Sequence, residues 1–321
     1  MMYLQLFGGI AVLLAAAEVF IRGAVSLAKI LDVPPLVIGM TVVAVGTSAP
    51  ELLVTLDAAL SGVPGIAVGN IIGSNIANVF LILGVSCLLS PIRGPAGANM
   101  RDGFVLMAGT LMFALLCEQG QLELWSGGAL FVAFLGFLAS TYRKESKDEK
   151  AAAEHVLEVE GMSPIAAPLW AVILSTVLGL AGIVWGAHLL VEGGVDVARV
   201  FGVSEEVIGL TVIALGTSLP ELAASVVAAF RGHADIAVGN VVGSNLFNIL
   251  GIAGLVAMVS PLPVSENILS FDIWVMVGAT ALVLPILAGR WHPGRWSGAF
   301  FLALYIGFIG YTGVSAGLFQ V

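Results

Sequence analysis

The sequence predicts an all-α, polytopic membrane protein built as two inverted five-helix repeats, and three observations lead to this fold class. The chain has 321 residues, of which 59% are hydrophobic and only 10% are charged. Apolar runs of about 20 residues, the length that crosses a bilayer, recur along it. One long segment of the sequence also occurs twice. Because the apolar runs are continuous rather than alternating, a transmembrane β-barrel is disfavoured.

The apolar runs divide the chain into ten expected membrane helices. They cover 4–28, 35–60, 66–90, 103–118, 124–142, 166–195, 206–230, 236–260, 271–289 and 297–318. No basic residue precedes the first run, so we expect a spanning helix there rather than a cleavable signal. The connection at 143–165 is short, polar and highly charged, which favours a linker over a further domain.

Lysine and arginine are distributed unequally between the two sides that ten spans create. Eleven of the twelve lie on one side, and Arg199 lies on the other. By the positive-inside rule, the side with eleven is cytoplasmic. We therefore expect a multi-pass protein of the cell membrane, with both termini outside and the 143–165 linker in the cytoplasm.

The duplicated segment comprises residues 37–91 and 207–261, related by an offset of 170 with 28 of 55 positions identical. Polar residues inside apolar helices are costly, and their default interpretation is functional. The repeated polar pairs are Thr47/Thr217, Ser48/Ser218, Glu51/Glu221, Asn70/Asn240, Ser74/Ser244, Asn75/Asn245 and Asn78/Asn248. Two copies of one polar set indicate a single site built from two halves.

The number of spans fixes how the two copies are related. Five expected spans fall in each half, at 1–142 and 166–321, and five is odd. The second copy therefore enters the membrane from the opposite side, as an inverted repeat. This arrangement is typical of secondary transporters, which bind their substrates near the membrane midplane.

The motif GTSAPE at Gly46–Glu51, repeated as GTSLPE at Gly216–Glu221, predicts a kinked or broken helix that carries a carboxylate. Pro50 has no N–H to donate and crowds the carbonyl of Gly46 one turn back. Freed carbonyls in a bilayer must be satisfied by protein, water or an ion. Ser48 lies three residues before Glu51, so we expect these two side chains to be neighbours on the helix.

The second motif, GNIIGSNIAN at Gly69–Asn78, returns as GNVVGSNLFN at Gly239–Asn248. Its small residues permit close helix approach, and Ser74 and Asn78 share one helical face. Together the motifs supply carboxylate, hydroxyl, amide and carbonyl oxygens but no His or Cys. Such hard ligands select Ca²⁺, Mg²⁺ or Na⁺ over zinc or copper.

These paired motifs resemble the α-1 and α-2 repeats of the Ca²⁺/cation antiporter superfamily, specifically the sodium/calcium exchanger family. The resemblance covers nearly the whole chain. It implies a core of spans two, three, seven and eight, across which spans one and six slide. It also implies Ca²⁺ export in exchange for Na⁺ by alternating access, without a cofactor and without enzyme activity.

The resemblance also implies a set of ion-ligating residues. Glu51 and Glu221 are the expected calcium carboxylates. Hydroxyl and carbonyl oxygens come from Thr47, Ser48, Thr217 and Ser218, backbone carbonyls from Ala44 and Ala214, and the remaining oxygens from Ser74, Ser244, Asn78 and Asn248. Many relatives carry Asp at the position of Asn248, so this chain is expected to have two acids in the site rather than three. Asn78 and Asn248 then form a symmetric neutral pair.

Other functions compete with this hypothesis. A Ca²⁺/H⁺ antiporter could use the same glutamates to exchange protons, and a cation channel could be lined by the same oxygens, although a single midplane site disfavours the channel. An intramembrane enzyme is disfavoured because no nucleophile–base pair is evident. The expected partners are Ca²⁺, Na⁺ and the lipid bilayer, not nucleic acid, and the sequence is compatible with a monomer. Coupling ion, stoichiometry and potassium dependence stay open.

Overall fold

Helices make up almost all of the part of the chain that the structure describes. The computed structural model describes residues 2–30, 47–62, 64–92, 100–145, 167–200, 214–231 and 234–315. Within these ranges, seven helices are long and apolar enough to cross a membrane. The helical membrane fold is confirmed, while the count of ten spans and the inverted order of the repeats stay predictions.

The helices of the first half overlap the expected spans. They are α1 (Met2–Ile30), α4 (Ala49–Leu60), α5 (Pro64–Ala77), η2 (Asn78–Ile82), α6 (Leu83–Leu89), α7 (Met100–Cys117) and α8 (Leu124–Glu145). The segments α5, η2 and α6 follow one another without a break and form one long helix. From residue 146 the expected linker lies outside the described residues, which resume at 167.

The helices of the second half also overlap the expected spans. They are α10 (Leu169–Val200), α12 (Ala214–Thr217), α13 (Leu219–Phe230), α14 (Ala234–Leu246), η4 (Phe247–Ile252), α15 (Ala253–Val259), η5 (Ile268–Asp272), α16 (Ile273–Leu287) and α17 (Arg295–Ser315). Here α14, η4 and α15 form the second long helix. Three segments, η2, η4 and η5, are π-helical, which the sequence did not predict.

The all-α prediction needs one addition in the described ranges, a two-residue antiparallel ribbon. Strand β1 (Gln121–Leu122), between α7 and α8, pairs with β2 (Leu262–Pro263), which follows α15. The N–H of Val264 also donates to the carbonyl of Gly120 at 2.8 Å, and Gly120 adopts a positive φ of 83° that favours glycine. The ribbon joins a loop of the first half to a loop of the second.

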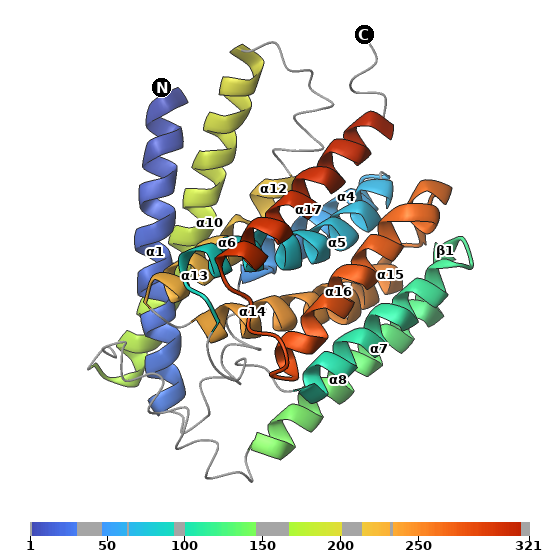
Figure 1. Cartoon of the computed structure of the whole chain (residues 1–321), viewed down its shortest axis with the longest axis horizontal. Helices are drawn as coiled ribbons and strands as arrows, with labels where there is room; N and C mark the ends of the chain where they lie inside the picture. Colours follow the sequence, from blue (N-terminus) through green and yellow to red (C-terminus); the bar gives the residue numbers. More distant parts are fainter. Residues whose placement is uncertain are drawn as a thin grey trace.

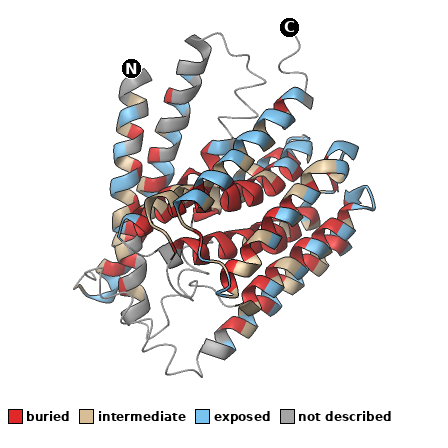
Figure 2. Cartoon of the chain, viewed as in Figure 1, coloured by how far each residue is buried: buried red, intermediate tan, exposed pale blue. Residues whose placement is uncertain are grey.

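The two long helices that carry the second motif lie in the centre of the molecule. About four fifths of their apolar spans are buried (78% for Pro64–Leu89 and 83% for Ala237–Val259), against 11% for the last helix, α17. Figure 2 shows this gradient, with buried residues concentrated on the central helices. Their polar motif residues are buried too, as expected of polar groups in membrane helices, which face the interior of the bundle.

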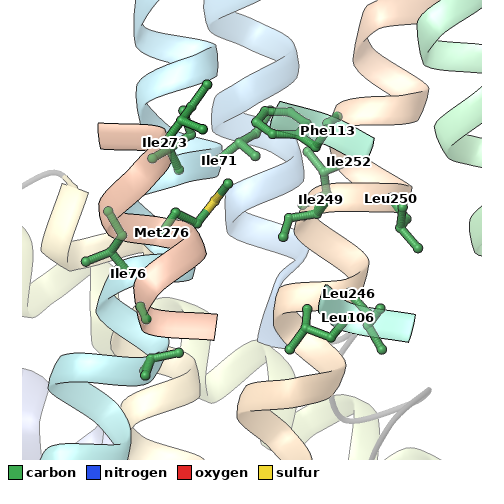
Figure 3. Close-up of a cluster of buried hydrophobic side chains, with 14 of the residues drawn as sticks. Ile71, Ile76, Leu106, Phe113, Leu246, Ile249, Leu250, Ile252, Ile273 and Met276 are labelled. Carbon is green, nitrogen blue, oxygen red and sulfur yellow. The ribbon is translucent and has the colours of Figure 1, made fainter. Parts of the chain in front are cut away.

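Apolar side chains from several helices fill the space around the central pair (Figure 3). Ile71 and Ile76 of α5 lie near Ile273 and Met276 of α16, and Leu246 and Leu250 lie near the α7 residues Leu106 and Phe113. All of these side chains are buried. They hold the central helices in place, so that the polar motif residues keep fixed positions.

Helices α1 and α10 form a separate pair at one edge of the molecule (Figure 1). Their backbones approach closely because glycines face the partner helix: a Cβ added to Gly179 would lie 2.6 Å from the Phe20 nitrogen, and one added to Gly186 would lie 2.7 Å from the Leu13 nitrogen. Small residues allow such close contact in membranes. The pair contacts the core mainly through α13.

Candidate cation-binding site

Each GTSxPE motif interrupts its helix, as the sequence predicts. Ser218 (φ −88°, ψ 3°) separates α12 from α13, and Ser48 (φ −85°, ψ 10°) precedes the first residue of α4. Pro50 and Pro220 stand at the start of the new helices, where the missing N–H is tolerated. The interruption leaves a helix N-terminus, which favours negative charge, beside each glutamate.

The two glutamates lie in the first turns of α4 and α13 and are buried, with 2% of Glu51 and 1% of Glu221 exposed. Two buried acids with a membrane core around them are costly unless they have a use. This arrangement is the centre of the candidate site.

Each carboxylate accepts a hydrogen bond from the serine of the other repeat. Ser48 Oγ donates to Glu221 Oε1 at 2.6 Å, and Ser218 Oγ donates to Glu51 Oε1 at 3.4 Å. Spacing along one helix gave no indication of these crossed bonds, because it describes only neighbours within the same repeat. The crossed bonds bring the two motifs into one site, as the repeat predicted.

Six buried oxygens on the predicted residues have no hydrogen-bond partner among the residues that the structure describes. They are Oε2 of Glu51, Oε2 of Glu221, Oγ of Ser74, Oγ of Ser244, Oδ1 of Asn78 and Oδ1 of Asn248. Buried polar atoms are nearly always paired, so such groups call for an explanation, and an ion is one. Carboxylate, hydroxyl and amide oxygens are the ligands of hard cations.

The threonines of the motif are buried at the same centre. Thr217 Oγ1 donates to Asn70 Oδ1 at 3.3 Å, and Thr47 hydrogen-bonds the carboxylate of Glu221. Of the two alanines expected to offer carbonyls, Ala214 begins α12, next to the interruption, and Ala44 lies outside the described residues. Hydrogen bonds thus bring the glutamates, serines and threonines of the two GTSxPE motifs together. Ser74, Ser244, Asn78 and Asn248 are buried on the two long central helices.

Sequence reasoning noted Asn70, Asn240 and Asn245 as repeated polar residues but did not place them in the site. The structure places two of them against the glutamate-bearing helices. Asn70 Nδ2 donates to Thr55 Oγ1 at 3.0 Å, and Asn240 Nδ2 donates to Ser225 Oγ at 3.1 Å. Thr55 and Ser225 are equivalent positions that differ in identity but share a hydroxyl. A search for identical residues in the two copies misses Thr55 and Ser225. A search for residues with the same hydrogen-bonding group, 170 positions apart, finds them.

The Asn78/Asn248 pair is neutral in both repeats, but its surroundings are not symmetric. Asn78 Nδ2 donates to Asn245 Oδ1 at 2.9 Å, and Asn245 Nδ2 in turn donates to the carbonyl of Asn75 at 3.3 Å. For Asn248, neither amide atom has a partner within the described ranges. One repeat therefore holds its asparagine firmly, while the other leaves both a donor and an acceptor available.

Charged residues outside the centre link α1 to the core. Glu18 accepts from Arg22, four residues later on α1, at 2.7 Å, and also from Arg231, the residue after α13, at 2.5 Å. On α10, His188 lies 3.3 Å from Glu192. These groups are partly exposed, and exposed ion pairs contribute little stability.

A bundle of membrane helices in which two interrupted helices meet at a buried, oxygen-rich centre defines a secondary transporter of cations. Comparison with known proteins gives the family. The chain belongs to the sodium/calcium exchangers: the family described as sodium/calcium exchanger protein matches residues 1–143 and 171–314. The chain is therefore a multi-pass membrane protein of a cation antiporter family.

Individual relatives match over nearly their whole length. CaxA of Alkalimonas amylolytica is 37% identical over 308 residues, which cover 94% of this chain and 95% of that protein. The sodium/calcium exchanger MaX1 of Methanosarcina acetivorans is 33% identical over 339 residues, which cover 96% and 97%. The sodium-calcium exchanger NCX_Mj, in a structure soaked with Na⁺ and Sr²⁺, is similar with a TM-score of 0.81 at 31% identity, covering 97% and 99%.

Proposed function

We propose that this antiporter exports Ca²⁺ in exchange for Na⁺ that enters the cell. The observation that carries the proposal is the crossed hydrogen bonding of Glu51 and Glu221. Each carboxylate uses Oε1 to accept from the opposite serine, while its buried Oε2 has no partner among the described residues. Two such oxygens, from two repeats, offer one shared position with a charge of −2 to a cation.

The charge of the two glutamates explains how exchange is coupled. One Ca²⁺ neutralises both carboxylates, and so do two Na⁺ ions, so the two cations compete for the same groups. Because the pair is costly to bury when uncompensated, movement of the empty site across the membrane is disfavoured. Each half-cycle then carries one kind of cation, which is the requirement for antiport.

The remaining ligands favour Na⁺ over H⁺ as the second cation. Exchange of Ca²⁺ for protons needs only the two carboxylates. The site also contains neutral oxygens on Ser74, Ser244, Asn78 and Asn248, which bind metal ions but do not take up protons at ordinary pH. Neutral hydroxyl and amide oxygens therefore supply places for Na⁺ that a proton antiporter does not need.

The repeats at 1–142 and 166–321 are proposed to run in opposite directions, with the site between them near the membrane midplane. Both termini then face outward, and the 143–165 linker is cytoplasmic. The proposed ligands are Glu51, Glu221, Thr47, Thr217, Ser48, Ser218, Ser74, Ser244, Asn78 and Asn248, with backbone carbonyls of Ala44 and Ala214. Alternating access would move the α1–α10 pair against the core that it contacts mainly through α13.

Radioactive Ca²⁺ flux in proteoliposomes tests the proposal, with Na⁺, K⁺ and pH gradients imposed one at a time. We expect uptake driven by an outward Na⁺ gradient, and loss of that uptake to background in Glu51→Gln and in Glu221→Gln. Glu266→Gln, at an exposed position outside the site, serves as the matched control and should behave as wild type. Uptake that follows pH and ignores Na⁺ would identify a Ca²⁺/H⁺ antiporter, and Ca²⁺ flux without any counter-ion would identify a channel.

A further inference from the structure

Asn70 joins the glutamate-bearing helix of the first repeat to the long central helix that follows it. Asn70 lies on α5, and its Nδ2 donates to two groups of α4, the carbonyl of Glu51 at 3.4 Å and Oγ1 of Thr55 at 3.0 Å. Thr55 is one turn beyond Glu51 on the same face. The amide therefore spans the first turn of α4, directly behind the carboxylate.

Asn240 makes the same pair of bonds in the second repeat. Its Nδ2, on α14, donates to the carbonyl of Glu221 at 3.4 Å and to Oγ of Ser225 at 3.1 Å. Asn70 and Asn240 are both buried, with 9% and 3% exposed. The same geometry thus occurs in both copies of the duplicated segment, which indicates that it is a structural feature of the site.

We infer that Asn70 and Asn240 are positioning residues that fix the orientation of Glu51 and Glu221 for cation binding. The first turn of a helix lacks half of its internal hydrogen bonds and is the part most ready to fray. An amide that holds this turn against a neighbouring helix limits rotation of the backbone that carries the carboxylate. A cation ligand must be held to within about 0.5 Å to bind well.

At Asn70 the hydrogen bonds distinguish this role from that of a ligand. Each Nδ2 is a donor and cannot coordinate a cation, and Oδ1 of Asn70 accepts from Thr217 at 3.3 Å. Asn70 therefore acts on the ion through Glu51, and its bond to Thr217 also reaches the motif of the second repeat. Oδ1 of Asn240 has no partner among the described residues, so the link between the repeats is made from the Asn70 side.

Concentration dependence of Ca²⁺ flux tests the inference, which rests on the proposed Ca²⁺ transport. Groups that orient metal ligands typically contribute 10–100-fold to metal affinity. For Asn70→Ala and Asn240→Ala we therefore expect the KM for Ca²⁺ to rise by about 10-fold or more, with the rate at saturating Ca²⁺ retained. Calorimetric titration of the detergent-solubilised protein with Ca²⁺ should show the same loss of affinity.

Thr110→Ala provides the control, because Thr110 of α7 is a buried polar residue outside the duplicated segment whose Oγ1 donates within its own helix, to the carbonyl of Leu106. Its KM should stay near wild type. An unchanged KM in Asn70→Ala, or a fall in maximal rate alone, would overturn the positioning role. Wild-type protein without any Ca²⁺ flux would instead overturn the proposed function.

Should the alanine variants fail to fold, Thr55→Val and Ser225→Ala carry the test. Each removes one acceptor of the asparagine amide while keeping nearly the same side-chain shape. We expect a smaller rise in KM, roughly five-fold, as follows from the loss of one hydrogen bond. A KM equal to that of wild type in both variants would contradict the inference.

Discussion

At the scale of single residues, Asn78 and Asn248 have the same identity and equivalent positions but different surroundings. Asn78 donates to Asn245, which donates onward to the first repeat, whereas Asn248 has neither amide atom paired among the described residues. An unpaired buried donor is not satisfied by a cation. Among the described residues, the asymmetry therefore leaves both a donor and an acceptor unpaired at Asn248, but only the acceptor Oδ1 at Asn78.

This difference predicts unequal effects of one substitution at the two positions. Asn78→Leu removes the donor to Asn245 and leaves a buried amide oxygen unpaired, at a cost of about 1–3 kcal/mol. Asn248→Leu breaks no hydrogen bond seen among the described residues. In thermal unfolding of the detergent-solubilised protein without added Ca²⁺, Asn78→Leu should melt at a lower temperature than Asn248→Leu. Equal melting temperatures would show that the Asn78–Asn245 bond contributes nothing.

Most of the candidate site could be predicted from the sequence, because polar residues are rare in apolar helices and a duplication shows which of them recur. Glu51, Glu221 and the serines Ser74 and Ser244 were all selected in this way. Their partners could not be selected. Spacing on one helix suggested that Ser48 neighbours Glu51, whereas its hydroxyl reaches Glu221 of the other repeat. Contacts between helices depend on tertiary packing, which spacing does not encode.

At the scale of elements, the two long central helices both change to a π-helix at the same place in the repeat. Segment η2 begins at Asn78, and η4 begins at Phe247, one residue before Asn248. A π-helical turn accommodates an extra residue and is frequent at functional sites. The sequence predicted these helices but not their π segments. An extra residue shifts the phase of the apolar pattern, and such a shift is hard to recognise in helices that are apolar on most faces.

Contact between α1 and α10 predicts sensitivity to very small substitutions. An added Cβ at Gly179 would lie 2.6 Å from the Phe20 nitrogen, so Gly179→Ala must push the helices apart, at a cost of about 1–3 kcal/mol. Gly8→Ala, on α1, is the control, since no described atom lies within 4 Å of a Cβ there. Melting curves in detergent should show a lower Tm for Gly179→Ala and no loss for Gly8→Ala. Similar losses in both would contradict close α1–α10 packing.

At the scale of the whole molecule, burial decreases from the two central helices to α17 at the periphery. This gradient was predictable only in part: the central helices carry the small and polar motif residues, but their mean hydropathies of 2.0 and 1.8 are only moderately above the 1.5 of α17. Lipid and protein are equally apolar surroundings, so hydropathy alone does not distinguish a helix facing lipid from one facing protein.

The inverted orientation of the repeats predicts opposite labelling of two equivalent residues. Ser61 and Arg231, 170 positions apart, each follow the glutamate-bearing helix and are exposed. A membrane-impermeant maleimide added to intact cells should label Ser61→Cys, while Arg231→Cys should react only after permeabilisation. The native Cys87 and Cys117 are buried and should not interfere. Labelling of both variants from one side would indicate a parallel duplication.

The crossed serine–glutamate bonds also have a consequence for how the protein is made. Ser218 is 167 residues later in the chain than Glu51, whose carboxylate it bonds. At a synthesis rate of about 5–20 residues per second, roughly 10–30 s separate the two. During that interval Glu51 is already part of a membrane helix, but the Ser218 hydroxyl that will offset part of the cost of burying its carboxylate has not yet been synthesised. Insertion of the first half therefore depends on water or the insertion machinery sheltering Glu51 until the second half is synthesised.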